Sequence, residues 1–330
     1  MTESRSRHLV DPELLPSLDL WPPMKLSAET LDEVRGLELP AMPIDPAVLE
    51  AVEMEKRRVP GSEGAPDVGL YVYRPRRRSG LTGCIFHIHG GGYVAGDAAF
   101  GEPTHRNMAA ELGCALVSVD YRLAPETVFP GAIEDCYAGL AWLFANAGTL
   151  GVDPARIGVM GESAGGGLAA ALALVARDRG EYRLAFQHLV YPMLDDRTCT
   201  REDPNPYSGE FIWTPDSNHF GWSSLLGTKP GGEDVSPYAA PARAQSLAGL
   251  PPTFIATAAL DLFVDEDMEY ARRLIRAGVP TELHVYPGAY HGFDFFADAP
   301  VSRQARADSL AALRRNLAGS DFGKTSPAGS

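Results

Sequence analysis

Short apolar runs alternate with amphipathic segments along most of this chain. Apolar runs of about four to eight residues between turn residues are typical of buried strands, and apolar residues three or four positions apart are typical of helices. Strands that alternate with helices predict βαβ units, and therefore a mostly parallel sheet with right-handed crossovers. Strands are expected at 50–60, 69–75, 81–89, 115–122, 155–160, 184–191, 253–260 and 281–286.

The first two strands differ from the others, because only a turn rich in Pro, Gly, Ser and Asp at 60–67 separates them. Such a short connection predicts an antiparallel, hairpin-like start. The later connections are long enough for helices, which the pattern places at 100–113, 132–147, 265–277 and 301–317. The expected fold class is α/β, with a mostly parallel eight-stranded sheet flanked by helices.

Two segments interrupt the alternation of strands and helices. Residues 1–45 are Pro-rich and amphipathic, and residues 193–230 are too aromatic for a flexible linker. We expect these two segments to form a helical cap over the carboxyl edge of the sheet; the alternative is a surface excursion that packs its aromatic residues on the core. The domain plan is an N-terminal cap part at 1–45, a core at 46–192 and 231–317, a cap insertion at 193–230, and a disordered tail at 318–330.

Composition narrows the functional classes. The 330 residues carry a net charge of −14, which argues against a nucleic-acid partner and against docking to an anionic membrane surface. We find neither an apolar run of about 18 residues nor an N-terminal signal sequence. The four cysteines show no C-x-x-C and no zinc spacing, so we expect reduced thiols, a cytoplasmic location, and neither metal nor cofactor.

The candidate chemistry centres on the sequence Gly-Glu-Ser-Ala-Gly at 161–165. It stands between an expected strand and an apolar helix rich in small residues. G-x-S-x-G in that position is typical of a nucleophile elbow, with Ser163 on a strained turn and the helix N-terminus directed at the site. An ordinary strand-to-helix turn with a serine cap would explain the pentapeptide equally well, so the other parts of the site must decide.

A serine nucleophile needs a general base and an acid that orients the base, and in α/β-hydrolases the chain order is Ser, Asp or Glu, His. Only His284 and His291 follow the acid candidates. His284 lies within the last expected strand, whereas His291 lies in a glycine-flanked loop just after it, so we choose His291. Asp261 directly follows the preceding strand and is the preferred acid, with Asp265 as the alternative. Asp265, Glu266 and Asp267 open the next expected helix, where capping charges at its N-terminus explain them.

An HGGG sequence ends the third expected strand, and such a loop supplies main-chain N–H donors to an oxyanion. We expect these donors to be Gly91, Gly92 and Ala164. The same glycines formally match a dinucleotide-binding fingerprint, but no acidic residue ends a second strand at the required distance and no helix follows at once. A metal site at His87 and His89 lacks a third ligand nearby.

Together, these motifs resemble the hormone-sensitive lipase family, the bacterial family IV carboxylesterases of the α/β-hydrolase superfamily. The resemblance spans about residues 50–317. It rests on the motifs at 89–93, 121–126, 161–166, 261–266 and 291–293, which follow the family's order.

The resemblance implies an α/β-hydrolase core with a helical cap, the Ser163–Asp261–His291 triad, and an oxyanion hole built as described above. It gives residues 121–126 a structural role. Two departures from the family pattern stand out. Glu162 replaces the usual Asp or Thr, so bracing of the glycine loop is expected to differ. Leu262 replaces the proline of the usual acid motif, which leaves a looser turn.

The expected activity is hydrolysis of short- to medium-chain carboxylic esters through an acyl-enzyme, with a small-molecule ester as partner and a homodimer as one option. Two alternatives remain: an amidase or arylamide deacetylase with the same triad, and a non-catalytic ligand receptor on the same fold. Plant gibberellin receptors resemble this family but lack the triad histidine. The expected substrate-binding residues are Tyr93, Trp21, Phe211, Trp213, Phe220 and Trp222.

Overall fold

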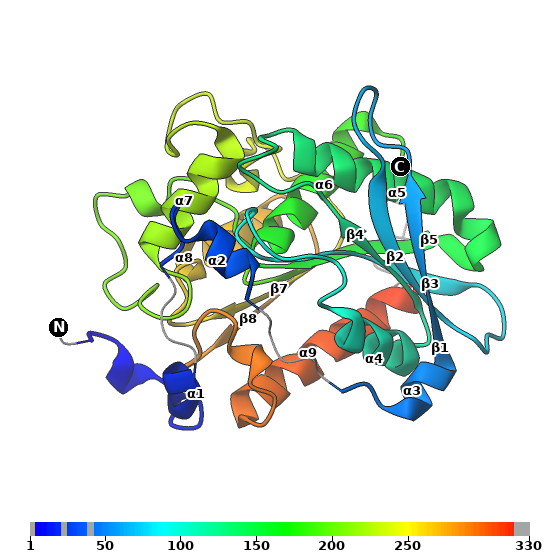
Figure 1. The fold of residues 1–330 in the computed structure, drawn as a ribbon, viewed down its shortest axis with the longest axis horizontal. Coiled ribbons are helices and arrows are strands. Elements are labelled where there is room, and N and C mark those ends of the chain that lie inside the picture. The colour runs from blue at the N-terminus through cyan, green and yellow to red at the C-terminus, as the bar shows by residue number, and fades with distance from the viewer. Residues whose placement is uncertain (1–3, 21–24, 38–42, 320–330) are drawn as a thin grey trace, which may run out of the picture.

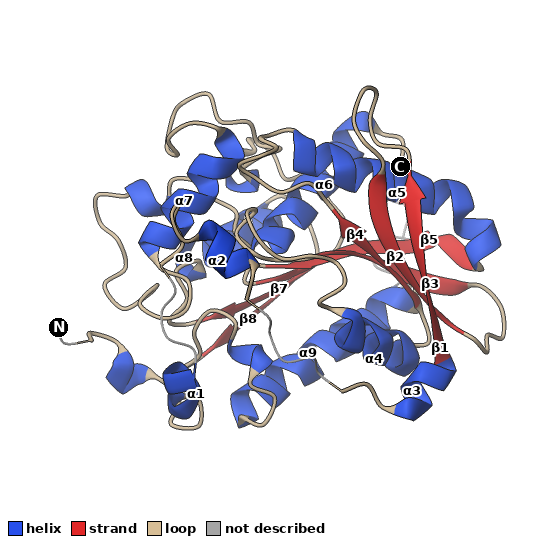
Figure 2. Cartoon of the chain, viewed as in Figure 1, coloured by secondary structure: helices blue, strands red, loops and turns tan. Residues whose placement is uncertain are grey.

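A single eight-stranded sheet forms the centre of the molecule, in the order β1-β2-β4-β3-β5-β6-β7-β8 (Figures 1 and 2). The computed structural model describes residues 4–20, 25–37 and 43–319. The expected strands are confirmed, with small shifts at their ends. They are β1 (Val52–Val59), β2 (Val68–Pro75), β3 (Thr82–Ile88), β4 (Ala115–Asp120), β5 (Val152–Glu162), β6 (Gln187–Val190), β7 (Thr253–Ala258) and β8 (Thr281–Tyr286).

Strand directions follow the connection lengths. The short turn after β1 gives an antiparallel β1–β2 pair, and β2 is also antiparallel to β4. Every pairing from β4 to β8 is parallel, with a helix in most connections. Strand β5 lies between β3 and β6, so the carboxyl ends of these three strands meet at one edge of the sheet. Parallel α/β sheets place their ligand sites at this edge.

Helices cover both faces of the sheet (Figure 1). Helices α5, α6 and α8 contribute to one buried cluster, and α4 and α9 to the other. The longer helices are α4 (Glu102–Leu112), α5 (Gly131–Leu150), α6 (Ala164–Arg179), α7 (Pro215–Leu226), α8 (Val264–Arg276) and α9 (Pro300–Leu317). The short ones are η1 (Arg7–Leu9), α1 (Leu15–Leu20), α2 (Leu31–Arg35), α3 (Pro46–Ala51), η2 (Thr198–Thr200), η3 (Pro241–Arg243) and η4 (Phe293–Phe295).

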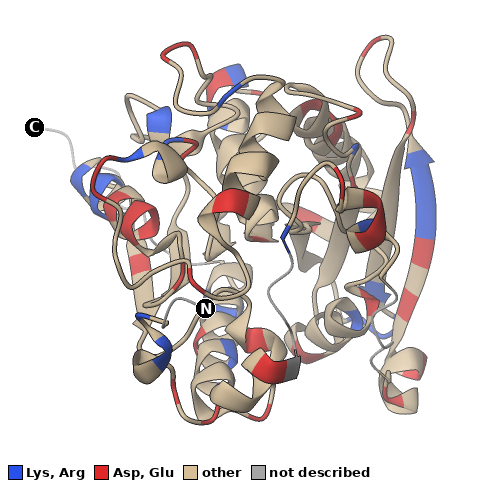
Figure 3. Cartoon of the chain, turned by 60° about the vertical axis from the view of Figure 1, so that its left-hand side comes forward, with Lys and Arg blue, Asp and Glu red and all other residues tan. Residues whose placement is uncertain are grey.

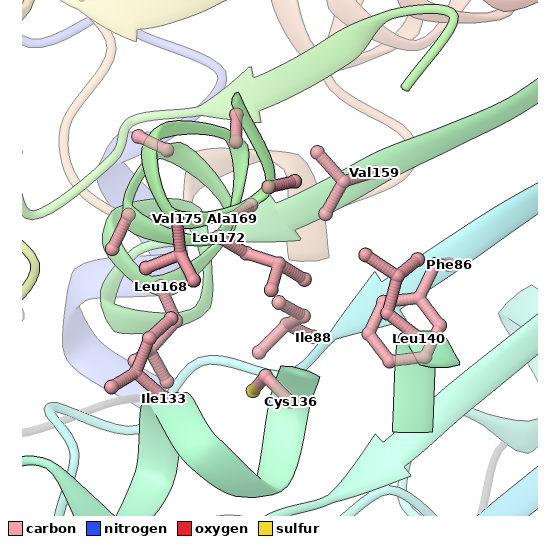
Figure 4. Packing of buried hydrophobic residues seen from close by; sticks show 14 of the residues in the cluster. Phe86, Ile88, Ile133, Cys136, Leu140, Val159, Leu168, Ala169, Leu172 and Val175 are labelled. Atoms are coloured by element: carbon pink, nitrogen blue, oxygen red, sulfur yellow. The ribbon is translucent and has the colours of Figure 1, made fainter. Parts of the chain in front are cut away.

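Helix α6 is buried along most of its length, because small side chains let it lie close to the sheet and to α5. All residues from Ala164 to Ala176 are buried. Figure 4 shows Leu168 and Leu172 of this helix facing Ile88 and Cys136 on β3 and α5. Since a close-packed helix resists displacement, the N-terminus of α6 holds a fixed position at the carboxyl end of β5.

The two segments outside the alternating pattern contact each other near the loop after β3. Leu26 and Leu31, from the N-terminal segment, form a small cluster with Val94 and Ala124, against which Trp213 and Phe220 pack. Trp21 and most of the expected disordered tail lie outside the described residues.

Charged residues lie on the helices and on the outer strands (Figure 3). Edge strand β1 carries Lys56, Arg57 and Arg58 in succession, and Arg57 pairs with Glu55 at 2.5 Å. Charge on an edge strand opposes pairing with another sheet. Within the described ranges, no helix is both long enough and apolar enough to cross a membrane.

Candidate active site

Ser163 occupies a strained turn between β5 and α6. Its backbone angles are φ 56° and ψ −122°, a region that residues with a side chain rarely adopt. Three hydrogen bonds hold this conformation. The Ser163 N–H donates to the Val190 carbonyl (2.9 Å), and the Ser163 carbonyl accepts from the amides of Met193 (2.9 Å) and Gly167 (3.0 Å). The turn therefore has the backbone geometry expected of a nucleophile elbow.

The glycines on either side of Ser163 are required by close backbone contacts. A Cβ atom on Gly161 would lie 2.2 Å from the carbonyl oxygen of Gly165. A Cβ atom on Gly165 would lie 2.1 Å from the carbonyl oxygen of Ile88, at the end of β3. Both distances are far below van der Waals contact, so only glycine allows the chain to reverse here while α6 lies against β3.

Ser163, His291 and Asp261 form one continuous hydrogen-bonded chain. The Nδ1 atom of His291 lies 2.7 Å from Oδ2 of Asp261, and its Nε2 atom lies 3.0 Å from Oγ of Ser163. All three residues are buried. The other Asp261 oxygen, Oδ1, accepts a hydrogen bond from the Phe263 amide at 3.0 Å, which fixes the carboxylate. An acceptor at Nδ1 favours the tautomer in which Nε2 is free to accept the serine proton.

The other acid and histidine that the sequence offered do not reach this chain. Asp265 is exposed on α8, and its Oδ1 accepts only a long hydrogen bond of 3.4 Å from Asn205. His284 lies on β8, and its Nε2 contacts Oε1 of Glu282 at 2.8 Å. The structure thus brings together the preferred residues and leaves both alternatives outside.

Three aromatic rings surround the imidazole of His291. The ring centroids of Tyr191, Phe263 and Trp213 lie 4.8, 5.3 and 6.1 Å from the imidazole centroid. Phe263 meets the imidazole edge-on, at an interplanar angle of 87°. Aromatic walls exclude water, and electrostatic interactions are stronger where water is excluded.

The glycine loop after β3 lies directly against the serine turn. A Cβ atom on Gly90 would be 3.4 Å from Cβ of Ser163. Gly91 and Gly92 have φ values of 115° and 60°, which favour glycine over residues with a side chain. Among the residues described, the structure records no backbone acceptor for the amides of Gly91, Gly92 and Ala164. Donation from these three amides to an oxyanion stays a prediction.

The segment 121–126 supports the glycine loop from below. The Tyr121 hydroxyl donates to the His89 carbonyl at 2.9 Å, and the two rings stack with centroids 4.2 Å apart. Arg122 is held by Asp135 on α5, with Nη2 2.7 Å from Oδ1. Burial lowers the pKa of His89, so this ring supports the loop in its neutral form.

Glu162, which departs from the family pattern, braces β5 against β3. Its Oε2 lies 2.9 Å from Nε2 of His87, and the His87 Nδ1 lies 2.9 Å from Oγ of Ser118 on β4. The longer side chain thus links three neighbouring strands just below the serine. Sequence reasoning considered His87 only as a metal ligand. The contact between His87 and Glu162 follows from the pairing of β3 with β5. This pairing places His87 beside Met160, two positions before Glu162.

Two acids in the first turn of α8 have a different environment from the one expected. Sequence reasoning assigned Glu266 and Asp267 to helix capping, but both are fully buried. Glu266 Oε1 accepts from the amides of Leu194 (2.6 Å) and Asp195 (3.2 Å), and its Oε2 accepts from the Thr198 hydroxyl. The loop after β6 covers this turn, so Glu266 fastens that loop. Burial raises the pKa of both carboxyls well above the usual range.

The predicted wall residues separate into two groups. Tyr93 and Trp222 are fully buried, and their ring centroids lie 5.2 Å apart. The Tyr93 hydroxyl donates to the Met193 carbonyl at 3.0 Å. These two residues fill the core beneath the site and expose no surface to a substrate.

Trp213 and Phe211 lie nearer His291. A Cβ atom on Gly92 would be 2.2 Å from the Trp213 ring, so this ring lies against the glycine loop. The Phe211 ring is 5.9 Å from that of Tyr290, which precedes His291. Phe220 packs with the cluster around Leu26 instead.

Residues 85–295 match the family described as alpha/beta hydrolase fold, which is more than half of the chain. This chain belongs to the α/β-hydrolase family. The motif set is that of its hormone-sensitive lipase group, the bacterial family IV. In this family, an elbow serine, a following acid and a later histidine meet at the carboxyl edge of the sheet.

The relatives extend the match over nearly the whole chain. Carboxylesterase NlhH of Mycobacterium tuberculosis is 36% identical over 325 residues, covering 96% of this chain and 99% of that protein. Esterase LipI of the same species is 35% identical over 319 residues, covering 94% and 96%. A solved structure titled bacterial heroin esterase is 40% identical, has a TM-score of 0.86, and covers 94% of this chain and 98% of its own.

The histidines, cysteines and acids of this α/β-hydrolase were also considered as metal ligands. Among its described residues, no group of three or more His, Cys, Asp or Glu side chains could hold a metal ion. The four cysteines are free thiols, three of them buried.

Proposed function

We propose that this α/β-hydrolase is a serine carboxylesterase in which Ser163 is the nucleophile, His291 the general base and Asp261 the residue that orients the base. The observation that carries this proposal is the hydrogen-bonded chain from Asp261 through His291 to Ser163, with distances of 2.7 and 3.0 Å. A nucleophile, base and orienting acid within hydrogen-bond reach of one another are the requirement for acyl transfer through serine.

The chain is a carboxylic ester hydrolase. Two relatives at 35–36% identity over almost the full length are named carboxylesterase and esterase, and a structural neighbour at 40% identity is titled an esterase. We expect the substrates to be small-molecule esters.

Acylation begins when Ser163 Oγ attacks the ester carbonyl carbon and its proton passes to Nε2 of His291. The carbonyl oxygen becomes an oxyanion that the amides of Gly91, Gly92 and Ala164 would stabilise, and one such donor typically contributes about 10²–10³ in rate. The imidazolium then gives its proton to the leaving alcohol as the C–O bond breaks. An acyl-enzyme on Ser163 results.

Deacylation repeats these steps with water in place of the serine. His291 Nε2 takes a proton from water, the hydroxide attacks the acyl carbon, and the same amides hold the second oxyanion. Ser163 leaves with the proton returned by His291, which restores the resting enzyme and releases the acid. Asp261 accepts the hydrogen bond from Nδ1 and stabilises the imidazolium.

We propose that substrates carry short to medium acyl chains, because bulky rings surround the reacting groups. Ser163 and His291 are each only 7% exposed, and Trp213 covers the glycine loop. In this proposal, residues 1–45 and 193–230 form a cap over the site, supported by the cluster that joins Leu26 and Leu31 to Trp213 and Phe220. A cytoplasmic location and a homodimer remain predictions, which fractionation and light scattering would test.

An arylamide deacetylase is the second candidate. A bovine relative named arylacetamide deacetylase is 30% identical over 312 residues, which covers 76% of this chain. The triad chemistry is common to both reactions, so the pocket decides between them. A non-catalytic receptor is disfavoured, because His291 is present and hydrogen-bonded to both of its partners.

The test of the proposed function compares the wild type with Ser163→Ala on nitrophenyl esters from acetate to palmitate. We expect hydrolysis of the shorter esters, with a loss of several powers of ten in kcat for the variant because the nucleophile is gone. A serine-directed phosphonate should label the wild type and not the variant. Near-wild-type activity of Ser163→Ala would sink the assignment, and faster turnover of matched arylamides would favour the deacetylase.

A further inference from the structure

A tyrosine that contacts the catalytic imidazole is hydrogen-bonded to a carboxylate. The ring centroids of Tyr191 and His291 are 4.8 Å apart, with an interplanar angle of 59°. The Tyr191 hydroxyl donates a hydrogen bond of 2.6 Å to Oδ1 of Asp294. Tyr191 is only 2% exposed, whereas Asp294 is half-buried. Neither residue belongs to the triad or to the oxyanion loop.

Both partners are held in place by the backbone around them. Tyr191 directly follows β6 with a φ of 34°, which is unfavourable for a residue with a side chain. Its amide donates to the Ala256 carbonyl on β7 at 2.6 Å. Asp294 follows His291 by three positions in the short helix η4, and Arg306 of α9 donates to its carbonyl. A strained residue fixed from two sides commonly marks a functional constraint.

The charged groups around the imidazole have distinct partners. Asp261 is the carboxylate that contacts Nδ1 of His291 directly, at 2.7 Å. Glu162 is hydrogen-bonded to His87 at 2.9 Å. The charges on Glu162 and Arg306 act on Asp294 in opposite directions. Asp294 is therefore the carboxylate that is linked to the imidazole indirectly, through the ring of Tyr191.

The other two rings at the imidazole have no such link to a carboxylate. Phe263 carries no polar group, and the Trp213 Nε1 donates to the amide oxygen of Asn218 at 3.1 Å. Only the Tyr191 ring is made more electron-rich by a hydrogen bond to an acidic side chain. An electron-rich ring face attracts an imidazolium cation more strongly than it attracts a neutral imidazole.

We propose that Tyr191 and Asp294 form a positioning pair that stabilises the imidazolium of His291 when Ser163 loses its proton. The phenol ring contacts the imidazole, and the carboxylate polarises that ring through the hydroxyl. This inference rests on the proposed triad and adds two residues that act through His291. The pair should stabilise the transition state and leave substrate binding unchanged, because the imidazolium forms only as the reaction proceeds.

Protonation of Asp294 weakens this contribution. Burial raises the pKa of the Asp294 carboxyl above its usual range, with Tyr191 opposing that shift. A raised pKa means that the carboxylate is present at higher pH and is lost as the pH falls through the raised value. Asp294→Asn keeps an acceptor for the hydroxyl and removes the charge, so this variant imitates the protonated form at every pH.

The experiment measures kcat and KM against pH for Tyr191→Phe, Asp294→Asn and the double variant. Each single change should lower kcat about threefold with KM unchanged, and should move the acidic limb of kcat/KM down by roughly half a pH unit, because His291 becomes less basic. The double variant should be no worse than the more severe single one, since Asp294 acts through the Tyr191 hydroxyl.

A matched control is Tyr286→Phe on β8. The Tyr286 hydroxyl donates to Oδ2 of Asp308 at 3.1 Å, which is also a partly buried hydrogen bond from a tyrosine to an aspartate. Its ring lies 6.0 Å from His284, and the structure gives it no ring contact with His291. Loss of this bond should leave the acidic limb and kcat unchanged, while thermal unfolding reports its effect on stability.

The outcomes separate this pair from a purely structural role. If Tyr191→Phe and Asp294→Asn behave like Tyr286→Phe, or if kcat falls while the acidic limb stays in place, the proposal is wrong. The same pH series measured as the rate of phosphonate labelling of Ser163 needs no ester. Labelling without ester hydrolysis in the wild type would refute the esterase assignment, and the shift of the labelling profile would still test the pair.

Discussion

At the scale of single residues, the site depends on which of several similar side chains reaches the histidine. Asp261 and Asp265 are four positions apart, and both follow β7. Asp261 emerges at the end of the strand and contacts His291 at 2.7 Å, whereas Asp265 has entered α8 and faces solvent. Asp261 lies in the loop between β7 and α8, whereas Asp265 lies in the first turn of α8, where its side chain is exposed.

Asp261→Asn should lower kcat by roughly 10⁴ with little change in the fold, because an amide in this place favours the wrong imidazole tautomer. Steady-state kinetics on a short nitrophenyl ester measures this loss. Asp265→Asn is the matched control and should keep wild-type kcat. If both variants lose activity to the same degree, the choice between the two acids is wrong.

At the scale of elements, the geometry of the turn at Ser163 depends on the close packing of α6 against β3. Thirteen consecutive residues, Ala164 to Ala176, are buried, and most of them are glycine or alanine. This contact holds the helix N-terminus and its free amides beside the glycine loop. The same contact leaves no room for a methyl group on Gly165, whose Cβ would lie 2.1 Å from a β3 carbonyl.

Gly165→Ala should destabilise the protein by roughly 3 kcal/mol or more. The new methyl group would meet the Ile88 carbonyl, and a backbone atom cannot move aside as a flexible side chain can. Urea unfolding followed by circular dichroism measures the change. Gly148→Ala in α5 is the control, because nothing lies within 4 Å of its Cβ position. It should stabilise the protein by about 0.5–1 kcal/mol. Equal effects of the two changes would contradict this account.

At the scale of the whole molecule, three buried histidines link folding to pH. Burial lowers the pKa of His89 and of His105, and lowers that of His188 to about 3. The unfolded chain has ordinary histidines, with a pKa near about 6.5. Between these limits the unfolded state binds more protons than the folded state, so stability falls as the pH falls below about 6.5.

The three histidines should therefore make the free energy of unfolding decrease from about pH 7 to pH 4, with a slope that reflects up to three protons. The raised pKa values of Glu266, Asp267 and Asp294 oppose this slope, because the folded state keeps protons that the unfolded chain has lost. Urea titrations at several pH values measure this slope. His188 stacks on Phe254 with centroids 4.2 Å apart, and its Nε2 contacts the Ser309 hydroxyl. His188→Gln should reduce the slope by up to one proton. A slope unaffected by this change would show that other groups control the acid limb.

The sequence by itself determined the order of strands and helices and the position of each motif at a strand end. Alternation of apolar runs with helical patterns is a local property, and glycine-rich turns mark where strands stop. Eight strands, an antiparallel start and Ser163, Asp261 and His291 at loop positions could all be predicted from such signals. The same local logic explained Glu266 and Asp267 as capping charges of a helix, and it did not foresee that both are buried.

Only the tertiary structure decided which side chains meet. Tyr191 and Asp294 are 103 positions apart, and Glu162 and His87 are 75 apart, so no local pattern links them. Their contacts depend on strand order and register, which set the neighbours of each strand end. Burial of Tyr93, Trp222 and Glu266 likewise follows from which loops cover them. Contacts between distant segments arise from packing, and packing is a property of the folded chain as a whole.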